Sequence, residues 1–482
     1  MSSAVAGYKR AFGADAVPCN YEDLEHCELL VLTGSNAAWT HPVLYRRIAE
    51  AKENNPRMRV VVIDPRRTAS CDLADLHLAL APGADAFLFN GLLAFLAKSG
   101  NLNEKYIQQH TEGFAAALET ANAVSEAELE QQTGISRDDL VTFYQWFAET
   151  EKSITFYSMG INQSATGTDK CNAIINCHLA TGRIGKLGAG PFSITGQPNA
   201  MGGREVGGLA NMLAAHMDYS PENIATLSAF WNSDQVSKQA GLKAVDLFDA
   251  VANGSIKAIW IMGTNPVVSM PNADQVKAAL EQCETVIVSD CIAETDTTAT
   301  ANILLPAAGW GEKSGTVTNS ERRISRQRAL VSAAGDARAD WWILAQVAKT
   351  MGFSESFDYQ SPRDVFIEHA QLSDYYNKGQ RLFNIGALSQ LSETDYDQLQ
   401  PIQWPVTVDS PQGTARLFED GQFITASGRA RFVTIRPSLP APRKSQDQFP
   451  LTLNSGRIRD QWHSMTRTGR ATPLLDHTDQ PF

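Results

Sequence analysis

The chain has 482 residues, of which 43% are hydrophobic and 20% are charged, and its formal net charge is −12. This length exceeds what one hydrophobic core can organise and predicts about three domains. The acidic balance argues against a nucleic-acid partner, because no surplus of Lys and Arg is present to neutralise phosphates. The longest apolar run, residues 86–97, is too short to span a bilayer, and the first residues lack the apolar stretch of a signal peptide.

The first part of the chain predicts a β-α-β unit. An apolar strand at 29–34 is followed by Gly-Ser-Asn, by a helix beginning near His41, and by a second apolar strand at 60–65. Continuous apolar runs of this kind are typical of parallel strands that are buried on both faces. Residues 101–151 then have the amphipathic spacing of helices.

A glycine-rich segment follows at residues 182–208. It holds nine of the 34 glycines and also carries Gln197, Arg204 and Glu205. Dense glycine lets the backbone approach a ligand closely, and the apolar residues between these glycines argue against a flexible linker. Arg204 is the best candidate for binding an oxyanion, because a guanidinium offers a rigid fork of donors. Glu205 could instead pair with it, and Gln197 adds a neutral donor and acceptor.

A second β-α-β unit is predicted by a strand at 256–263, a Gly-Thr-Asn-Pro turn, a helix near 272–282 and a strand at 286–290. In both units a Gly and an Asn follow the first strand and an Asp ends the second. Such a turn presents free N–H groups to a phosphate, and the Asp can accept hydrogen bonds from a ribose or base. The repetition suggests two nucleotide-binding half-sites, although turns also favour Gly and Asn without any ligand.

The remaining elements are a helix at 340–352, a hairpin at 416–435 with turns at Asp-Gly and Ser-Gly, and a Pro-rich linker at 437–448. A new element begins at Phe449.

The seven cysteines and nine histidines form no self-sufficient catalytic or metal site. No two cysteines have the C-x-x-C spacing of zinc and iron–sulfur ligands, and their odd, scattered set is typical of reduced, buried thiols. No Ser-His-Asp order, His cluster or pair of carboxylates stands out. His463, within DQWHSMTR, is the one histidine expected near a ligand. A bound cofactor is therefore expected to supply the chemistry.

From Met159 to Gly208 the sequence resembles the large subunits of molybdopterin oxidoreductases, a family that contains formate dehydrogenases and prokaryotic nitrate reductases. The resemblance covers essentially all of the chain, and its most specific part is the loop from Thr195 to Gly208, TGQPNAMGGREVGG. Within the family this loop is similar to that of the cytoplasmic assimilatory nitrate reductases. Formate dehydrogenases have a differently composed loop, and periplasmic nitrate reductases carry an extra residue before the Arg.

The resemblance implies an α/β multi-domain core with two pseudo-symmetric Rossmann-like β-α-β dinucleotide-binding domains and the start of a C-terminal β-barrel-like domain. The expected boundaries are 1–150 for the first cofactor-binding domain with its helical extension and 151–340 for the second, including the glycine-rich loop. Residues 341–436 are expected to pack on the first domain. Residues 437–448 are the linker, and 449–482 begin the last cofactor-binding domain.

The implied cofactor is one molybdenum held by two pyranopterin guanine dinucleotides. Asp85 would hold the guanine of the first dinucleotide, whose expected contacts are Gly34, Ser35, Asn36, Asp64, Pro65, Arg66, Arg67, Thr68, Gly83 and Asp85. The expected contacts of the second are Met159, Gln163, Asn265, Ser289, Asp290, Lys313 and Asp340. The start of the last domain would contribute Ser455, Gly456, Arg457, Trp462, His463, Met465 and Thr466. Near molybdenum, Arg204 would attract and orient nitrate, and Gln197 would help to position it.

The chain also departs from the family pattern. We expect the family's [4Fe–4S] domain to be missing from this chain, and the family's molybdenum-ligating Cys would stand directly before Met1. Met1 is therefore expected beside the metal, and no metal ligand is expected in the chain. We also expect the last domain to be shorter than in the family. We therefore expect the central part of a cytoplasmic nitrate reductase catalytic subunit, itself inactive. The intact enzyme would receive electrons through the cluster from ferredoxin, flavodoxin or a NAD(P)H-oxidising subunit. The alternatives are a formate dehydrogenase-like enzyme and a non-catalytic nucleotide-binding scaffold.

Overall fold

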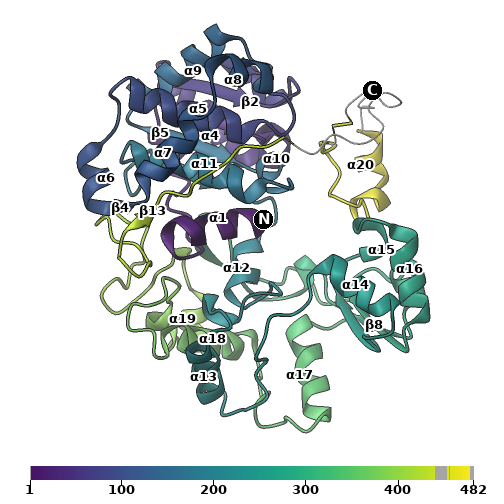
Figure 1. Ribbon diagram of the computed structural model, residues 1–482. Coiled ribbons are helices and arrows are strands. Elements are labelled where there is room, and N and C mark those ends of the chain that lie inside the picture. The colour runs from purple at the N-terminus through teal and green to yellow at the C-terminus, as the bar shows by residue number, and fades with distance from the viewer. Residues whose placement is uncertain (1, 440–452, 455, 478–482) are drawn as a thin grey trace.

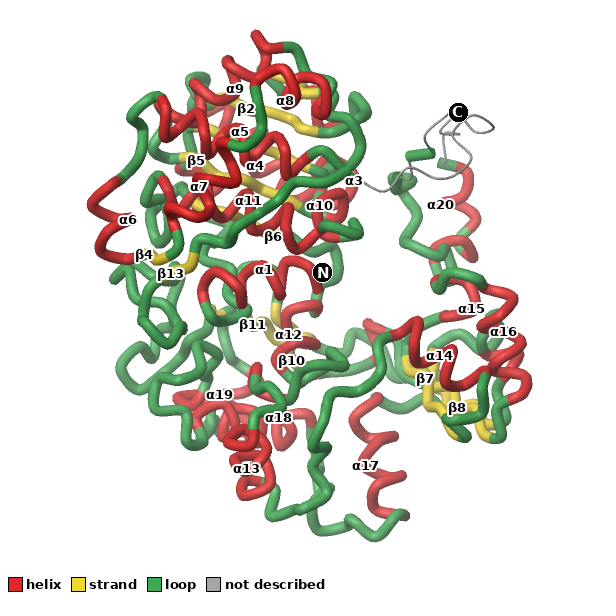
Figure 2. Tube along the Cα trace, viewed as in Figure 1, coloured by secondary structure: helices red, strands yellow, loops and turns green. Residues whose placement is uncertain are grey.

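The computed structural model describes residues 2–439, 453–454 and 456–477 (Figure 1). Two hydrophobic cores divide this part of the chain into a main body and a small body. The main body holds a five-stranded sheet covered by helices, and the small body lies beside it around a three-stranded sheet (Figure 2). The fold is therefore mixed α/β with parallel sheets.

The five-stranded sheet of the main body is parallel throughout and has the strand order β3-β2-β1-β5-β6. Its strands are β1 (Leu29–Thr33), β2 (Arg59–Ile63), β3 (Leu76–Leu78), β5 (Ser153–Tyr157) and β6 (Gly190–Ser193). Every residue of β1 and β5 is buried, as the apolar run at 29–34 predicts. In the register of the sheet, Leu29 lies opposite both Arg59 and Ser153.

Helices connect and cover these strands. The crossover from β1 to β2 is α4 (Pro42–Asn54), and that from β5 to β6 is α11 (Gly167–Ala180). The amphipathic region 101–151 forms α6 (Glu104–His110), α7 (Phe114–Asn122), α8 (Glu126–Thr133) and α9 (Arg137–Glu149), as the sequence predicts. Other helices of this part are α1 (Ser2–Phe12), α2 (Asp23–His26), α3 (Ala37–Thr40), α5 (Asp85–Lys98), α10 (Met159–Asn162) and α12 (Ala200–Glu205).

The first sheet continues across the boundary that the sequence suggested between residues 150 and 151. Strand β5 pairs with β1 along its whole length, and β6 pairs with β5, so both strands belong to the first unit. The glycine-rich segment therefore begins inside the main body and contributes a strand to its sheet. The reason is that Ile154 and Phe156 bury their side chains completely in the core of this sheet.

The small body contains the second β-α-β unit, as the sequence predicts. Its parallel strands β7 (Ala258–Met262), β8 (Thr285–Asp290) and β9 (Ile303–Pro306) lie in that order. Helices α14 (Ala244–Ala252) and α16 (Ala273–Gln282) pack on each other, and α15 (Pro266–Ser269) is adjacent. The core is small: Phe248, Ile261, Leu280 and Val286 are among its buried residues.

The remainder of the main body forms around an antiparallel sheet of β10 (Gly315–Thr318), β11 (Arg323–Gln327) and β12 (Ile402–Gln403). Helices α13 (Pro221–Phe230), α18 (Pro362–Asp374) and α19 (Glu393–Asp397) lie here, α17 (Asp340–Thr350) forms where the sequence predicts a helix, and α20 (Thr472–Asp476) is the last helix. Within the described residues, no helix combines the length and the apolar character needed to cross a bilayer.

The prediction of a hairpin at 416–435 is wrong. Only β13 (Ala430–Arg431) forms there, and it pairs in parallel with β4 (Thr111–Glu112) instead of with a neighbouring strand. The Asp-Gly and Ser-Gly turns do form, with positive φ at both glycines. Between them the chain is irregular because Phe418 and Phe423 both pack against Phe12, with ring centroids 5.2 and 5.4 Å apart.

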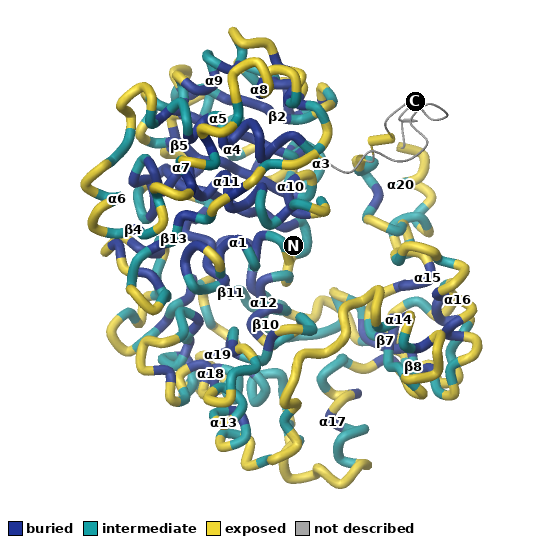
Figure 3. Tube along the Cα trace, in the orientation of Figure 1, coloured by how far each residue is buried: buried dark blue, intermediate teal, exposed yellow. Residues whose placement is uncertain are grey.

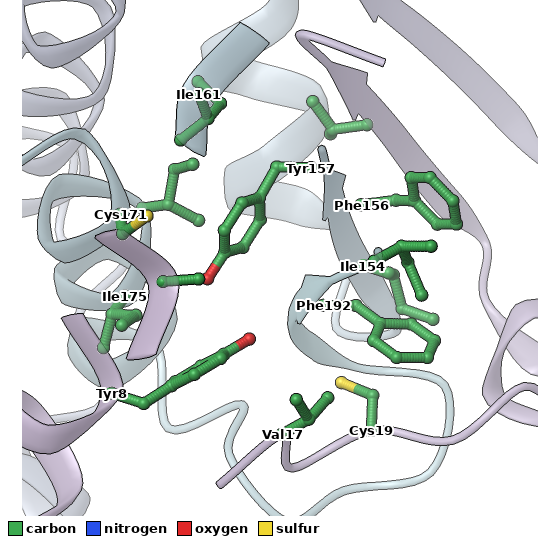
Figure 4. Packing of buried hydrophobic residues seen from close by; sticks show 14 of the residues in the cluster. Tyr8, Val17, Cys19, Ile154, Phe156, Tyr157, Ile161, Cys171, Ile175 and Phe192 are labelled. Atoms are coloured by element: carbon green, nitrogen blue, oxygen red, sulfur yellow. The ribbon is translucent and has the colours of Figure 1, made fainter. Parts of the chain in front are cut away.

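The core of the main body joins the N-terminal helix to the sheet (Figure 4). Tyr8 of α1 lies among buried residues of β5, β6 and α11, including Tyr157, Phe192 and Cys171. Its hydroxyl donates to the Pro191 carbonyl at 3.1 Å and accepts from the Ser193 amide at 3.0 Å. Figure 3 shows the same pattern at larger scale, with buried chain concentrated along the sheet and exposed chain at the rim. The carboxyl ends of the strands are thereby held on a rigid support.

Candidate functional site

The strand order of the main sheet reverses between β1 and β5. From β1 the chain continues to β2 on one side, and from β5 it continues to β6 on the other. In open parallel sheets a crevice forms outside the carboxyl ends at such a reversal. Here Gly34 and Gly160 meet: the Gly160 amide donates to the Gly34 carbonyl at 2.9 Å, and a Cβ on Gly34 would lie 2.8 Å from the Gly160 Cα. Because Gly34 also has φ of +56°, no other residue fits here without strain.

A cavity of about 530 Å³ opens at this point, within the range of small-molecule sites. Its walls come from the loops after several strands of the main sheet, from α11, and from Asn454 and residues 456–465 of the C-terminal segment. Many residues that the sequence nominated line it: Gly34, Ser35, Asn36, Asp64, Pro65, Arg66, Gly83, Asp85, Met159, Gln163, Gln197, Gly456, Arg457, Trp462, His463 and Met465. Met159 and Gln163, expected at the second dinucleotide, thus lie with the first set.

Several polar groups of the cavity have no hydrogen-bond partner in the protein. They are Ser35 Oγ, Gln197 Oε1, Arg66 Nε and Arg457 Nε. A buried polar group without a partner costs free energy, so these atoms suit a polar ligand. The Arg66 guanidinium lies against Gly456, where an added Cβ would displace the end of the arginine side chain.

Two carboxylates and one ammonium line part of the cavity. Asp64 Oδ1 accepts from the Arg66 amide at 2.9 Å, and burial raises the pKa of this carboxyl. The Asp85 Oδ2 atom lies 2.6 Å from the Nζ of Lys170, with side chains that are 10% and 3% exposed. Lys170 was missed by the sequence reasoning. Its signal is the single Lys of α11, a helix in which every residue from Lys170 to Ala180 is buried.

The first part of the glycine-rich loop is held over the cavity by two histidines. His41, which was also missed, contacts the Thr195 carbonyl through Nε2 at 2.9 Å. His463 Nε2 lies 3.2 Å from Gln197 Nε2, so the structure brings these two nominated residues together. Burial lowers the pKa of both histidines and so favours their neutral forms. The Thr195 carbonyl can only accept, so His41 Nε2 donates the hydrogen bond to it, and the Nε2 of a neutral His463 can accept a hydrogen bond from the Gln197 amide.

Arg204 does not line the cavity. It is buried in α12, and its Nε lies 2.8 Å from Asp15 Oδ2, without the alignment of a hydrogen bond. Asp15, which the sequence did not nominate, is 1% exposed, and its carboxylate oxygens have no hydrogen-bond partner. Glu205 does not pair with Arg204, as the sequence had allowed: it accepts from Trp404 Nε1 at 2.6 Å and Thr318 Oγ1 at 2.9 Å. Burial raises the pKa of Glu205 to about 7.

The residues nominated for the second half-site gather at the carboxyl ends of β7 and β8. Asn265 Oδ1 accepts from Thr297 Oγ1 at 2.6 Å, and its amide donates to Thr466 Oγ1 at 3.0 Å. Asp290 lies 3.4 Å from Arg467, and Ser289 Oγ accepts from Trp260 Nε1 at 2.8 Å. The C-terminal segment thus contacts residues of both half-sites, and Figure 1 shows its last helix, α20, above α15 of the small body.

The other nominated residues are dispersed. Lys313 and Asp340 pair at 2.6 Å near the start of α17. Beside the first site, Arg67 is exposed and Thr68 is buried, and both lie outside the cavity lining. Met1 and Ser455 lie outside the described residues. Among the described residues, no group of three or more His, Cys, Asp or Glu is arranged to hold a metal ion.

Comparison with known proteins shows which family this chain resembles. A family model for molybdopterin oxidoreductases matches residues 2–350. The chain is 54% identical over 481 residues to a nitrate reductase of Klebsiella oxytoca and 50% identical over 489 residues to one of Shewanella frigidimarina. These alignments cover all of this chain but 54% and 52% of those proteins, so the chain spans about half the length of these curated relatives.

Two further similarities are more distant. The assimilatory nitrate reductase catalytic subunit of Bacillus subtilis is 31% identical and is covered over 67% of its length. The solved structure of acetylene hydratase from Pelobacter acetylenicus matches 98% of this chain and 66% of its own, with a TM-score of 0.68 and 15% identity. At this identity the structural match shows a shared fold.

Proposed function

This chain belongs to the molybdopterin oxidoreductase family, and we propose that its function is the reduction of nitrate to nitrite. The observation that carries this proposal is the 54% identity to a nitrate reductase across the whole chain. A second candidate is formate oxidation, because the F420-dependent formate dehydrogenase subunit alpha of Methanocaldococcus jannaschii is 30% identical over 481 residues. The much higher identity to nitrate reductases favours nitrate as the substrate.

The proposed cofactor is molybdenum bound by two pyranopterin guanine dinucleotides, with one dinucleotide in each half-site. The unpartnered Ser35 and Arg66 groups and the close approach at Gly34 and Gly456 fit a phosphate-bearing ligand in the first. Asn265 and Asp290 would hold the second. When bound, the metal centre supplies the two-electron, oxygen-atom-transfer chemistry.

The repeated order of Gly, Asn and Asp at the strand ends supports a further proposal about architecture. The two β-α-β units would be Rossmann-like halves related by pseudo-symmetry. Residues 449–482 would begin a C-terminal β-barrel-like domain. The proposed electron route, by resemblance to the assimilatory enzymes, runs from ferredoxin, flavodoxin or a NAD(P)H-oxidising subunit through a [4Fe–4S] cluster in the cytoplasm.

The role proposed for the chain's own residues is to attract and orient the anion. The positive charge of Arg204 is proposed to attract nitrate toward the loop that carries Gln197, although this side chain pairs with Asp15 and lies outside the cavity lining. Gln197 lies at the cavity and can donate its amide to an oxygen of nitrate. His41 holds the loop that carries Gln197, so this amide is oriented before substrate arrives.

The test is an assay of the full-length holoenzyme, purified from a host that makes molybdenum cofactor. Nitrite formation with reduced methyl viologen and formate oxidation with oxidised viologen are measured on the same preparation. We expect nitrite formation and no formate oxidation. Formate oxidation alone would favour the second candidate, and cofactor-loaded protein with neither activity would favour a non-catalytic scaffold.

A further inference from the structure

The chain holds two Lys–Asp pairs of the same construction, one that lines the cavity of the first half-site and one at the start of α17. Asp85 is the first residue of α5 and Asp340 the first residue of α17, so each carboxylate sits at the positive end of a helix. Each has a lysine Nζ at 2.6 Å, from Lys170 and Lys313 respectively. The pairs differ in exposure: the first has side chains 3% and 10% exposed, and the second 28% and 37%.

The burial of the first pair makes its components dependent on each other. Lys170 projects from α11, which packs on α5, and a buried ammonium without a counter-charge is costly. Both partners nevertheless line the cavity instead of being sealed between the helices. The pair therefore joins two helices and also presents a carboxylate of fixed orientation to whatever occupies the cavity.

A fixed carboxylate matches one nucleobase edge in particular. Guanine presents two adjacent donors, N1–H and the exocyclic N2–H₂, which a carboxylate can accept side by side. Adenine and cytosine place a bare ring nitrogen beside their amino group, and its lone pair would face the carboxylate. Lys170 engages Oδ2 of Asp85 from one side, and a carboxylate has about four acceptor positions, so the others remain free.

We propose that Lys170 is a positioning residue for guanine recognition, which holds the Asp85 carboxylate in the orientation that accepts both donors of the base. This inference rests on the proposed function, which supplies a guanine-bearing cofactor. Lys170 acts through Asp85 and does not itself contact the base. Its effect on binding therefore exists only while Asp85 carries a carboxylate.

The test measures the affinities of GMP, XMP and CMP for the purified chain by isothermal titration calorimetry. The wild type should bind GMP more tightly than CMP. Lys170→Met should weaken GMP binding about tenfold and leave CMP binding unchanged, because the carboxylate is no longer held. Lys170→Arg should retain most of the preference. Lys98→Met, at the exposed end of α5, is the matched control and should change neither affinity.

Asp85→Asn separates recognition from folding. An amide offers one acceptor and one donor, which match N1–H and the C2 carbonyl of xanthine, so the preference should change from GMP to XMP. The double variant Asp85→Asn with Lys170→Met has no buried unpaired charge and should keep the XMP preference. Circular dichroism confirms that each variant is folded.

Different outcomes would refute the guanine cofactor and the role of Lys170. A wild type without preference for GMP over CMP would remove the guanine cofactor from the first half-site, and the inference with it. A wild type that prefers GMP, together with a folded Lys170→Met that keeps the same preference, would overturn the role of Lys170 and leave the proposed function standing.

Discussion

Replacing Asp15 by Asn should destabilise the main body by about 3–5 kcal/mol, because it leaves the guanidinium of Arg204 buried beside a neutral amide. The two side chains are 1% and 9% exposed, and Nε and Oδ2 are 2.8 Å apart, so little water can compensate the lost charge. The other polar contact of Arg204, from Nη2 to the sulfur of Met201 at 2.9 Å, cannot replace it.

The chain offers a matched control for this experiment. Arg10 and Asp169 are also 2.8 Å apart, but their side chains are 50% and 44% exposed. Asp169→Asn should therefore cost about 1 kcal/mol or less, as exposed pairs do. The free energy of unfolding is measured by urea denaturation, followed by circular dichroism, for both variants under the same conditions.

A double-mutant cycle tests whether the effect belongs to the pair. Arg204→Met alone leaves the Asp15 carboxylate without its counter-charge, and the double variant removes both charges. The losses of the two single variants, added together, should exceed the loss of the double variant by about 2 kcal/mol or more. If Asp15→Asn costs no more than Asp169→Asn, the reasoning from burial is refuted.

Three further predictions concern single residues. The folded-state pKa of Glu205, raised to about 7 from 4.5, means that the wild type loses stability as the pH rises from about 4.5 to 7, by up to about 3 kcal/mol. Glu205→Gln should lack this loss, and urea midpoints at pH 5 and pH 8 that differ equally in both proteins would contradict it. Gly34→Ala should lower the free energy of unfolding by more than about 2 kcal/mol, because the added Cβ meets Gly160. Gly263→Ala, at the equivalent turn of the small body, has open space around its Cβ and should lower it by only about 1 kcal/mol. Equal urea midpoints for the two variants would be inconsistent with the close approach of Gly34 and Gly160. In the holoenzyme, Arg204→Ala should raise the KM for nitrate and lower kcat/KM by roughly 10²-fold, and unchanged kinetics would remove Arg204 from the substrate site.

The β-α-β units could be predicted because their strands are continuous apolar runs, which leave few alternatives to buried parallel strands. Strand β6 was not predicted, because it begins with Gly190 and Pro191, and both residue types disfavour strands. It forms because the neighbouring β5 supplies a partner. The extent of the first sheet therefore depends on pairing between distant segments, which local sequence does not contain.

The candidate site likewise divides into residues that local sequence predicts and residues that depend on contacts between distant segments. Asn36 and Asp64 were predictable because the carboxyl ends of neighbouring parallel strands lie together, so a sequence position implies a place in space. The partners Lys170 and Asp15 were not predictable, since they lie 85 and 189 residues from Asp85 and Arg204. The partner of a buried charge is set by how distant segments pack together. The apolar residues around Lys170 in the sequence predict that Lys170 is buried, but not which carboxylate it pairs with.

The C-terminal segment reaches Gln197 at one half-site through His463 and Asn265 at the other through Thr466. A ligand that fixes this segment against the main sheet therefore also brings Thr466 and Arg467 to the small body. The conformational entropy lost in ordering the segment is incurred once, with the first ligand, and the second binds an already ordered surface. Through this shared segment the two half-sites would be coupled in binding free energy, and by reciprocity each ligand would change the affinity of the other by the same factor.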